Sequence, residues 1–324
     1  MNEKKQLISR RTVLASAGAV AAATLVDGGV SSGHAAAEML GPSTPTHFRF
    51  KLGEFEVTTI LDGAIQVPTV NKIFGQDQKA EDVAALMGAN HLPGDKMEIG
   101  FTPVVVNTGK EVVLFDSGNG AARRPKAGNL LVALKQAGYS PKEIDAVVIT
   151  HFHPDHIGGL MEDGEIAFPN ARYVAGETEF NFWTAADQAE GRVGKLANSN
   201  VKPLAPKMTF VKPEQEASPG ITAIDAFGHT PGHMGYHIES GKDRLILMAD
   251  ACNHYVASMQ RPDWHVKFDM DKAAAAATRK KLLDMAAADK IPVAGYHMPF
   301  PAVGFVERRD IGYRWAPVSY QFNL

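Results

Sequence analysis

Short apolar segments separated by turn residues run along most of this chain. Segments 48–52 and 55–60 alternate apolar and polar residues or are rich in β-branched ones, and Gly53-Glu54 lies between them, which predicts a hairpin. Strands are also predicted for segments 102–107, 111–115, 144–150, 173–175, 220–227, 235–239, 244–248 and 292–294. Most of these segments are short and apolar, which is typical of buried strands.

Helices are predicted between several of these strands. Segment 130–137 repeats apolar residues at helical spacing, and segment 272–289 is rich in alanine. An acidic, aromatic helix is expected over 177–186. The span 69–100 is polar and mixed, so we expect a short helix at 80–87 within a loop able to cover a functional site. Strands that alternate with helices predict a layered α/β architecture in a single domain.

The first 37 residues have the features of an export signal. Basic residues precede an apolar, Ala-rich segment at 12–26, and small residues at 31–37 suit a signal peptidase. Segment 9–14, Ser-Arg-Arg-Thr-Val-Leu, resembles a twin-arginine signal. The alternatives are a surface helix or a membrane anchor, but the segment is short for a bilayer span of roughly 20 apolar residues. We therefore expect no stable membrane anchor, and a domain of residues 38–324 that is periplasmic or secreted.

Composition and charge limit the classes of function. The chain has 324 residues, of which 45% are hydrophobic and 21% charged, and this suits a globular protein. The formal net charge of −3 provides no strong basic field for nucleic acid, so we expect no nucleic-acid partner. The single cysteine, Cys252, excludes an internal disulfide and is expected to be a small core residue.

Six residues at the end of one apolar segment are unusually rich in metal ligands. His151-Phe152-His153-Pro154-Asp155-His156 follows the predicted strand 144–150 directly. In extended chain, His151 and His153 point to the same side and can bind one ion. A turn after Pro154 can direct Asp155 and His156 to a second ion. No packing requirement explains this density of imidazole and carboxylate groups.

Residues further along the chain can complete the two sites. His229 lies in Gly-His-Thr-Pro-Gly-His at 228–233, and Asp250 and His297 follow. Imidazole and carboxylate ligands favour zinc, with iron, manganese, cobalt or nickel as alternatives. The sequence therefore predicts two divalent metal ions, most readily Zn²⁺, as the cofactors.

The order and spacing of these residues resemble the metallo-β-lactamase superfamily over nearly the whole chain after the signal. The resemblance implies an αββα sandwich, in which helices flank two β-sheets and a dinuclear site lies at one sheet edge. The implied ligands are His151, His153 and His229 for one ion, Asp155, His156 and His297 for the other, and Asp250 as the bridge.

The same resemblance assigns a supporting residue. Phe115-Asp116-Ser117-Gly118 resembles the strand-end Asp-Thr-Gly segment of the family, with Ser117 in place of threonine. Asp116 would then orient a ligand histidine by accepting its hydrogen bond, and the alternative is a plain turn residue. His233 is expected to be a structural hydrogen-bonding residue and not a ligand.

Two metal ions imply hydrolytic chemistry. They lower the pKa of bound water towards ~7, so that a bridging hydroxide can attack an electrophilic carbon or phosphorus. Asp250 and Asp155 are the predicted catalytic carboxylates, with Asp155 relaying a proton to the leaving group. No site for a redox cofactor can be identified in the sequence.

Two branches of the superfamily suggest different substrates: the acyl-homoserine lactonases of quorum quenching, and organophosphate triesterases of the methyl parathion hydrolase type. The second resembles this chain more extensively, at 52–57, 153–161, 167–171 and 312–314. Phe182 and Trp183 also match that branch, and they suggest an apolar pocket wall, with core packing as the alternative. The lactonase branch usually has tyrosine three positions after the bridging aspartate, where this chain has Asn253. We expect a hydrolase of small-molecule lactones, esters or phosphotriesters, with some promiscuity.

Three rival functions are open. A thioester hydrolase of the glyoxalase II type would use the same site. A β-lactamase is disfavoured, because the common pattern of that group replaces the bridging aspartate. An exported metal-binding protein without catalysis is disfavoured by the complete set of seven ligands. The resemblance also makes a homodimer one of the assemblies to test, although the sequence reveals no interface.

Overall fold

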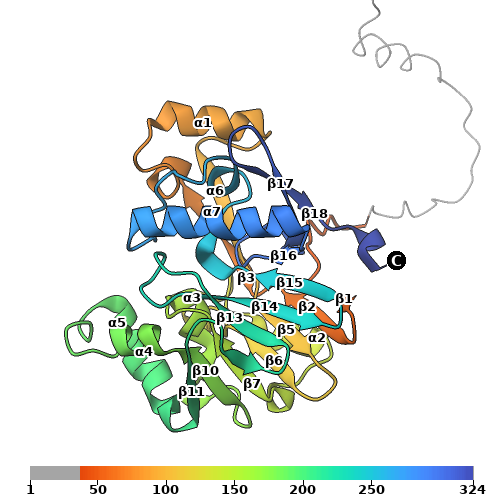
Figure 1. The fold of residues 1–324 in the computed structure, drawn as a ribbon, viewed down its shortest axis with the longest axis vertical. Helices are drawn as coiled ribbons and strands as arrows, with labels where there is room; N and C mark the ends of the chain where they lie inside the picture. The colour runs from red at the N-terminus through yellow and green to blue at the C-terminus, as the bar shows by residue number, and fades with distance from the viewer. Residues whose placement is uncertain (1–36, 324) are drawn as a thin grey trace, which may run out of the picture. The chain divides into compact units, whose positions relative to one another are not determined.

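Two β-sheets form the centre of the part of the chain that the structure describes (Figure 1). The first contains, in order, β1 (His47–Leu52), β2 (Phe55–Ile60), β5 (Val104–Asn107), β6 (Val112–Phe115), β7 (Ala146–Ile149), β10 (Arg172–Gly176) and β11 (Met208–Val211). The second contains β12 (Glu216–Ser218), β13 (Ile221–Asp225), β14 (Met234–Ser240), β15 (Asp243–Leu247), β16 (Val293–Ala294), β17 (Val303–Arg308) and β18 (Tyr313–Pro317).

The computed structural model describes residues 37–323. The predicted export signal therefore lies outside the described residues, except for Ala37. Residues 37–43 contain neither helix nor strand, and the described residues from Thr44 onward form one compact unit. That unit carries all of the predicted site residues.

The main core lies between the inner faces of the two sheets. Val57, Val106 and Phe115 from the first sheet pack with Tyr236 and Leu247 from the second, and each is at most 4% exposed. Full burial of a large apolar side chain stabilises the fold by about 1.5–3 kcal/mol relative to exposure. The inward-facing apolar residues of the strands therefore hold the sheets together.

Helices cover the outer face of each sheet. Leu134 of α2 (Leu130–Gln136) packs in one cluster with Leu114 and Val147 of the first sheet. Leu283 of α7 (Lys272–Asp289) packs with Ile246 of the second sheet. The predicted αββα sandwich is confirmed, and α7 crosses the molecule above β15 and β16 in Figure 1.

Three parallel strands explain why polar side chains gather at one edge. β7 pairs in parallel with β6 on one side and with β10 on the other. The carboxyl ends of all three therefore meet at the same sheet edge. Asp116 follows β6, His151 follows β7 after one residue, and the helix α4 (Glu177–Trp183) follows β10 directly.

Most predicted helices occur close to their expected positions. Helix α7 has the predicted bounds; the Asp271 side chain caps it by accepting from the Ala274 amide, and Lys290 ends it in a left-handed conformation. The helix predicted at 80–87 is α1 (Ala80–Ala89), and the one predicted at 177–186 is the shorter α4.

The loop predicted for 69–100 was wrong at its end. Its last residues begin β4 (Lys96–Phe101), which pairs antiparallel with β3 (Gly63–Pro68). The strand is hard to identify from sequence because exposed Lys96 and Glu98 alternate with less exposed neighbours, and Gly100 interrupts the apolar face. The predicted elements also omitted β3, β8 (Met161–Glu162), β9 (Glu165–Ile166), β11, β12, β17 and β18.

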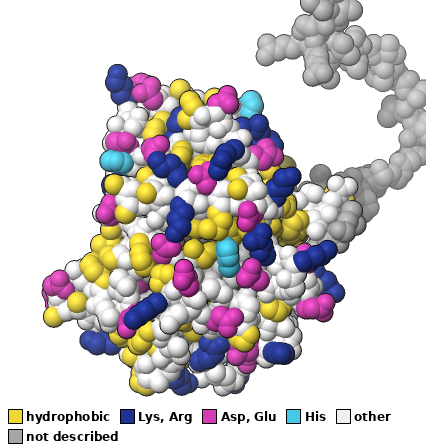
Figure 2. Space-filling model, in the orientation of Figure 1, with side chains coloured by type: hydrophobic (Ala, Val, Ile, Leu, Met, Phe, Trp, Pro, Cys, Tyr) yellow, Lys and Arg dark blue, Asp and Glu magenta, His cyan; other side chains and the backbone are white. Residues whose placement is uncertain are grey.

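The surface has charged side chains of both signs. Figure 2 shows lysine and arginine interspersed with aspartate and glutamate on the visible face, with apolar groups between them. This mixture agrees with the small net charge of −3. Among the described helices, none combines the length and the apolar character required to cross a membrane.

Candidate metal centre and substrate cavity

The ligand-rich segment makes a turn at the end of β7. His151 and His153 lie in the turn itself, and Asp155 and His156 lie in the short helix α3 (Pro154–Ile157). Pro154 occupies the first helical position, where its missing N–H leaves no hydrogen bond unmade. The turn directs all four side chains toward the sheet edge.

Three imidazoles and one carboxylate form the first group of potential ligands. His153 Nδ1 lies 3.0 Å from His151 Nε2 and 2.9 Å from His229 Nε2. Oδ2 of Asp250 lies 3.3 Å from His229 Nε2 and 3.9 Å from His151 Nε2. One atom from each of these four residues lies within 4.8 Å of the others, which suits a single ion.

Asp155, His156 and His297 form the second group. Oδ2 of Asp155 lies 3.7 Å from His156 Nε2 and 3.5 Å from His297 Nε2. Their ligand atoms also lie within 4.8 Å of one another. The structure thus divides the predicted ligands between two adjacent groups, as the resemblance implied.

Asp250 faces both groups. It lies in a 3-10 turn, Ala249–Ala251, directly after β15 and Met248. Its Oδ2 is 3.1 Å from His297 Nε2 as well as near the first group, and its Oδ1 is 3.3 Å from His156 Nε2. Among the described residues, Oδ1 of Asp250 and Nε2 of His156 are buried without a hydrogen-bond partner. Because buried polar atoms almost always have partners, this orphaned pair is what two divalent metal ions would satisfy.

The carboxylates give the second group a strong preference for positive charge. Burial opposes a charged His156, yet Asp116, Asp250 and Asp155 hold the pKa of its imidazole well above the ordinary value. The pKa of His297 is also raised, because the charge and hydrogen bond of Asp250 and the charge of Asp155 together outweigh the large effect of burial. A field that favours a proton on an imidazole also favours a metal ion, which takes the place of that proton.

In the first group, the surroundings lower the pKa values of two imidazoles instead of raising them. Burial, followed by the charge of His156, lowers the pKa of His151 well below its ordinary value. Burial and His229 together lower the pKa of His153 to about 3. These two imidazoles therefore stay neutral at physiological pH, which is the form that binds metal.

Asp116 occupies the position that the resemblance implied. Its Oδ2 accepts a hydrogen bond from His156 Nδ1 at 2.8 Å, which leaves Nε2 directed at the ligand group. Thr150 supports the same carboxylate with its backbone N–H at 2.8 Å and its hydroxyl at 2.9 Å. Burial raises the pKa of Asp116 despite these favourable hydrogen bonds.

A second supporting carboxylate, Asp269, was absent from the sequence prediction. Its Oδ1 lies 2.9 Å from His229 Nδ1, and its Oδ2 accepts a hydrogen bond from Arg279 at 2.7 Å. Arg279 is 1% exposed in α7, and it also donates to the carbonyls of Ala251 and Pro262. This arrangement fixes the ring of His229 through a buried charge pair.

Glu179 of α4 was also missed, although it joins both ligand-bearing loops. Its Oε1 accepts from the Phe152 amide at 2.8 Å and from the Trp183 indole at 2.8 Å. Its Oε2 accepts from the Thr230 hydroxyl at 2.7 Å and from the Gly232 amide at 3.0 Å. The sequence contained an indication of this role. Glu179 follows the end of β10, which is parallel to β7, so its carboxylate lies at the same sheet edge as the ligands that follow β7.

Neighbouring residues complete the environment of Asp250. The amide of Asn253 donates to Oδ2 of Asp250 at 3.0 Å. His233 is buried and uses both ring nitrogens for structure, at the Ala226 carbonyl and the Asp250 amide. Cys252 is buried, and burial raises the pKa of its thiol to about 12, which leaves it protonated and unreactive.

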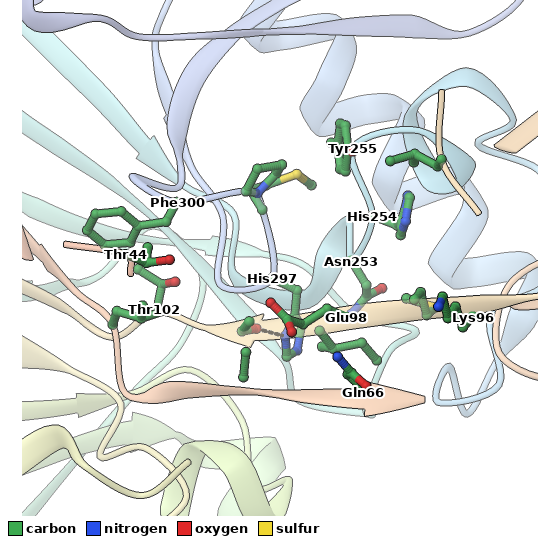
Figure 3. Close-up of a pocket in the computed structure, with 18 of the residues that line it drawn as sticks. Thr44, Gln66, Lys96, Glu98, Thr102, Asn253, His254, Tyr255, His297 and Phe300 are labelled. Carbon is green, nitrogen blue, oxygen red and sulfur yellow. Dashed lines mark hydrogen bonds between the residues drawn. The ribbon is translucent and has the colours of Figure 1, made fainter. Parts of the chain in front are cut away.

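Two cavities adjoin the ligand groups. One of about 220 Å³ is lined by the potential ligands His153, Asp155, Asp250 and His297 and by mostly apolar walls. The other, of about 610 Å³, lies beside the two-stranded sheet of β3 and β4, and Figure 3 shows His297, Asn253 and Tyr255 among its residues. Ile99, Asn253 and His297 line both. The smaller cavity is the better candidate for the reacting part of a substrate because it contains the carboxylates.

Phe182 and Trp183 do not line either cavity, so the predicted pocket wall needs correction. Trp183 is 7% exposed, packs in the core on the outer face of the first sheet and donates to Glu179. Phe182 packs against the same cluster. The described residues that supply the apolar wall of the smaller cavity are Ile65, Phe74, Ile99, Phe101, Val193 and Phe268. These residues lie far apart in sequence, which explains why no local pattern identified them.

Comparisons with known proteins agree with this geometry. The family described as the Metallo-beta-lactamase superfamily matches residues 102–292, so the chain belongs to that superfamily. An N-acyl homoserine lactonase from Bacillus cereus is 25% identical over 169 residues, which cover 52% of this chain and 62% of that protein. The lactonase AiiB from Agrobacterium fabrum is 29% identical over 145 residues, with 41% and 49% covered. The chain thus matches less than two thirds of the length of these relatives.

Solved structures match over a larger part of the chain. AidC, a dizinc quorum-quenching lactonase in complex with a product, has a TM-score of 0.79 and 28% identity, covering 85% of this chain and 98% of AidC. AbOPH, a hydrolase in the beta lactamase superfamily, has a TM-score of 0.79 and 26% identity, covering 86% and 99%. The fold and the family predicted from sequence are confirmed, and the clustered ligands fit two divalent ions such as zinc.

Proposed function

We propose that this protein is a dinuclear metal-dependent hydrolase of lactones and other carboxylic esters. The observation that carries the proposal is Asp250, whose two oxygens face two adjacent groups of potential ligands. The likeness to a dizinc lactonase and to N-acyl homoserine lactonases supports this choice of bond. A thioester hydrolase would use the same centre and is a competing outcome of the test below.

Each polar residue at the cavity has a distinct role in the proposed reaction. When bound, the two ions supply a hydroxide nucleophile at neutral pH and a Lewis acid for the substrate oxygen. Asp250 holds the two groups together, while Asp116 and Asp269 fix the rings of His156 and His229. The carboxylate of Asp155 is 15% exposed at the cavity, where it can carry a proton to the departing alcohol.

Phosphotriesters are the second candidate substrates. Asn253 occupies the position at which the lactonase branch usually has tyrosine, and its amide is bound to Asp250. Tyr255 lines only the larger of the two cavities. With no phenol at the smaller cavity, its mostly apolar walls suit an uncharged phosphotriester as well as an ester.

Location and assembly are further proposals. The twin-arginine-like segment at 9–14 supports export to the periplasm or beyond. Cell fractionation of the full chain, with a variant in which both Arg10 and Arg11 are replaced by lysine as control, tests this proposal. Retention of both forms in the cytoplasm would contradict export.

A homodimer is the assembly that we propose to test, and light scattering of the purified protein measures it.

The decisive experiment measures metal content and substrate turnover together. The purified protein should contain about two equivalents of zinc or a related ion, and it should hydrolyse lactones and aryl esters faster than thioesters. Chelation should abolish turnover, and added zinc or cobalt should restore it. Full activity of the chelated protein, or bound metal without turnover of any lactone, ester or phosphotriester, would overturn the proposal. Faster turnover of phosphotriesters than of lactones would favour the second candidate.

A further inference from the structure

Two arginines line the smaller cavity in addition to its potential metal ligands. Arg123 lies in the 3-10 turn Ala121–Arg123 after β6, and Arg192 begins α5 (Arg192–Leu196). Every other lining residue that is not a potential ligand is uncharged. The cavity beside the metal centre is thus apolar on most sides and cationic at one side.

Arg123 is held close to the ligand groups. Its guanidinium carbon lies 5.1 Å from the centre of the Phe101 ring, a cation–π contact. Phe101 is 1% exposed, and its ring meets the His297 ring edge-on at 5.5 Å. One aromatic ring therefore separates the Arg123 guanidinium from a potential ligand of the metal centre.

Neither guanidinium has an acidic partner among the described residues. The recorded ion pairs and side-chain hydrogen bonds of the described part of the chain include neither Arg123 nor Arg192. The neighbouring Lys195 differs, because Glu190 lies 3.3 Å from its amine and compensates its charge. Arg123 and Arg192 therefore bring positive charge to the cavity without a direct ion pair, Arg123 from a partly buried position and Arg192 from an exposed one.

The two arginines lie where two cavities meet. Together with Pro154 they line both the smaller cavity and an adjacent, more polar one of about 650 Å³. A substrate whose ester bond lies at the ligand groups can direct its acyl chain along the apolar wall and its far end toward these arginines. An arginine binds a carboxylate through paired N–H groups, and such charge-assisted bonds are roughly twice as strong as neutral ones.

We propose that Arg123 and Arg192 form a subsite for a carboxylate that the substrate carries away from the bond that is cleaved. This inference rests on the proposed hydrolase function and narrows its substrates to acidic esters or lactones. Water adds to the acyl carbon, the acyl C–O bond breaks, and the departing alcohol takes a proton. An acidic ester is thereby converted to a dicarboxylate.

Matched aryl esters test the subsite. The 4-nitrophenyl monoesters of succinate, glutarate and adipate are compared with 4-nitrophenyl butanoate, pentanoate and hexanoate, which have the same chain lengths without the charge. The zinc-loaded protein should show a kcat/KM at least about tenfold higher for one acidic ester than for its neutral match. That advantage should fall as salt concentration rises.

Arginine variants locate the effect. Arg123→Gln and Arg192→Gln should each lower kcat/KM for the preferred acidic ester about fivefold to tenfold, mainly through KM, with less than a twofold change for its neutral match. Lys202→Gln is the control, because this exposed lysine lines neither of the two cavities, and it should change the ratio of the two rates less than twofold. Binding of monomethyl glutarate, measured by calorimetry, should weaken in both arginine variants and persist in the control.

The outcomes separate the subsite from the function as a whole. Equal rates for acidic and neutral esters, or equal losses for both in the arginine variants, would overturn the subsite while leaving the hydrolase proposal in place. Absence of metal-dependent turnover for all six esters and for lactones would overturn the hydrolase proposal itself. The same loss in the Lys202 variant as in the arginine variants would show a general charge effect and would also contradict a specific subsite.

Discussion

Two buried carboxylates support opposite sides of the metal centre by different means. Asp116 and Asp269 each bind Nδ1 of one potential ligand, at 2.8 Å and 2.9 Å respectively. Apart from that imidazole, Asp116 is supported by the N–H and hydroxyl of Thr150, whereas Asp269 is supported by the guanidinium of Arg279. The two carboxylates thus bind their imidazoles at similar distances, but only Asp269 also binds a guanidinium.

The pKa values of the two carboxyls reflect this difference. Burial raises the pKa of Asp116 beyond what its hydrogen bonds can offset. Burial acts in the same direction on Asp269, but the hydrogen bond with His229 and the charge of Arg279 hold its pKa below the ordinary value. We infer that Asp116 serves mainly to orient metal ligands, while Asp269 also contributes to a charge pair on which the fold depends.

The largest effect is expected at Asp250, which the two sides share. Asp250→Asn should lower kcat/KM for a lactone or aryl ester by more than about a hundredfold, because losses at supporting residues alone reach 10–100-fold. Initial rates at saturating zinc measure this effect, with circular dichroism as the control for folding. Near-normal activity in a folded variant would show that neither group of potential ligands requires the Asp250 carboxylate.

Replacement of Arg279 should cause the largest loss of stability. Arg279→Met leaves Asp269 buried without a cationic partner and should lower the free energy of unfolding by about 3–5 kcal/mol. Urea unfolding measures this change in the free energy of unfolding. The exposed pair between Lys280 of the same helix and Asp263 is the control, and Lys280→Gln should change stability by about 0–1 kcal/mol. Similar losses in the two variants would remove the distinction between buried and exposed pairs.

Asp116→Asn should affect metal binding more than folding. The variant should bind zinc about 10–100-fold more weakly, because His156 loses the acceptor that orients it. Its unfolding free energy, measured with a chelator present, should fall less than that of Asp269→Asn, because a protonated His156 still faces Asp155 and Asp250, whereas Arg279 has no second carboxylate among the described residues. Competition with a chromogenic chelator gives the affinity. The reverse order of stabilities would contradict the comparison.

The smallest effect is expected at Thr150. Thr150→Val retains the backbone N–H but removes the hydroxyl that donates to Asp116, which should cost about 0.5–1.5 kcal/mol of stability. Activity should change only a few-fold, because His156 keeps its acceptor. Thermal unfolding and steady-state kinetics measure the two effects. A loss as large as that of Asp116→Asn would mean that the hydroxyl, and not the carboxylate, orients the ring.

The sequence predicted those features that are encoded locally. The ligand-rich segment 151–156 follows a strand directly, and the strand sets the direction of its side chains. Helix α7 was predicted with its observed bounds because its high alanine content lies within the segment itself. The later ligands His229, Asp250 and His297 were identified through the resemblance to a family.

Features made by contacts between distant segments were not predictable. Asp269 and Arg279 are ordinary charged residues in sequence, and only the packing of α7 on the second sheet buries them beside His229. The cavity wall combines Ile65, Phe101 and Phe268, which no periodic pattern links. Aromatic Phe182 and Trp183 were chosen for the wall from their local appearance, and the structure places them in the core instead.

The seven potential ligands extend from His151 to His297, and both sheets are needed to bring them together. A partly folded chain can present the segment at 151–156 but not the whole set. Metal occupancy is therefore thermodynamically linked to completion of the native state, and each tenfold rise in free zinc above the dissociation constant adds about 1.4 kcal/mol of stability for each bound ion. The melting temperature of this protein should then report the zinc supply of its surroundings.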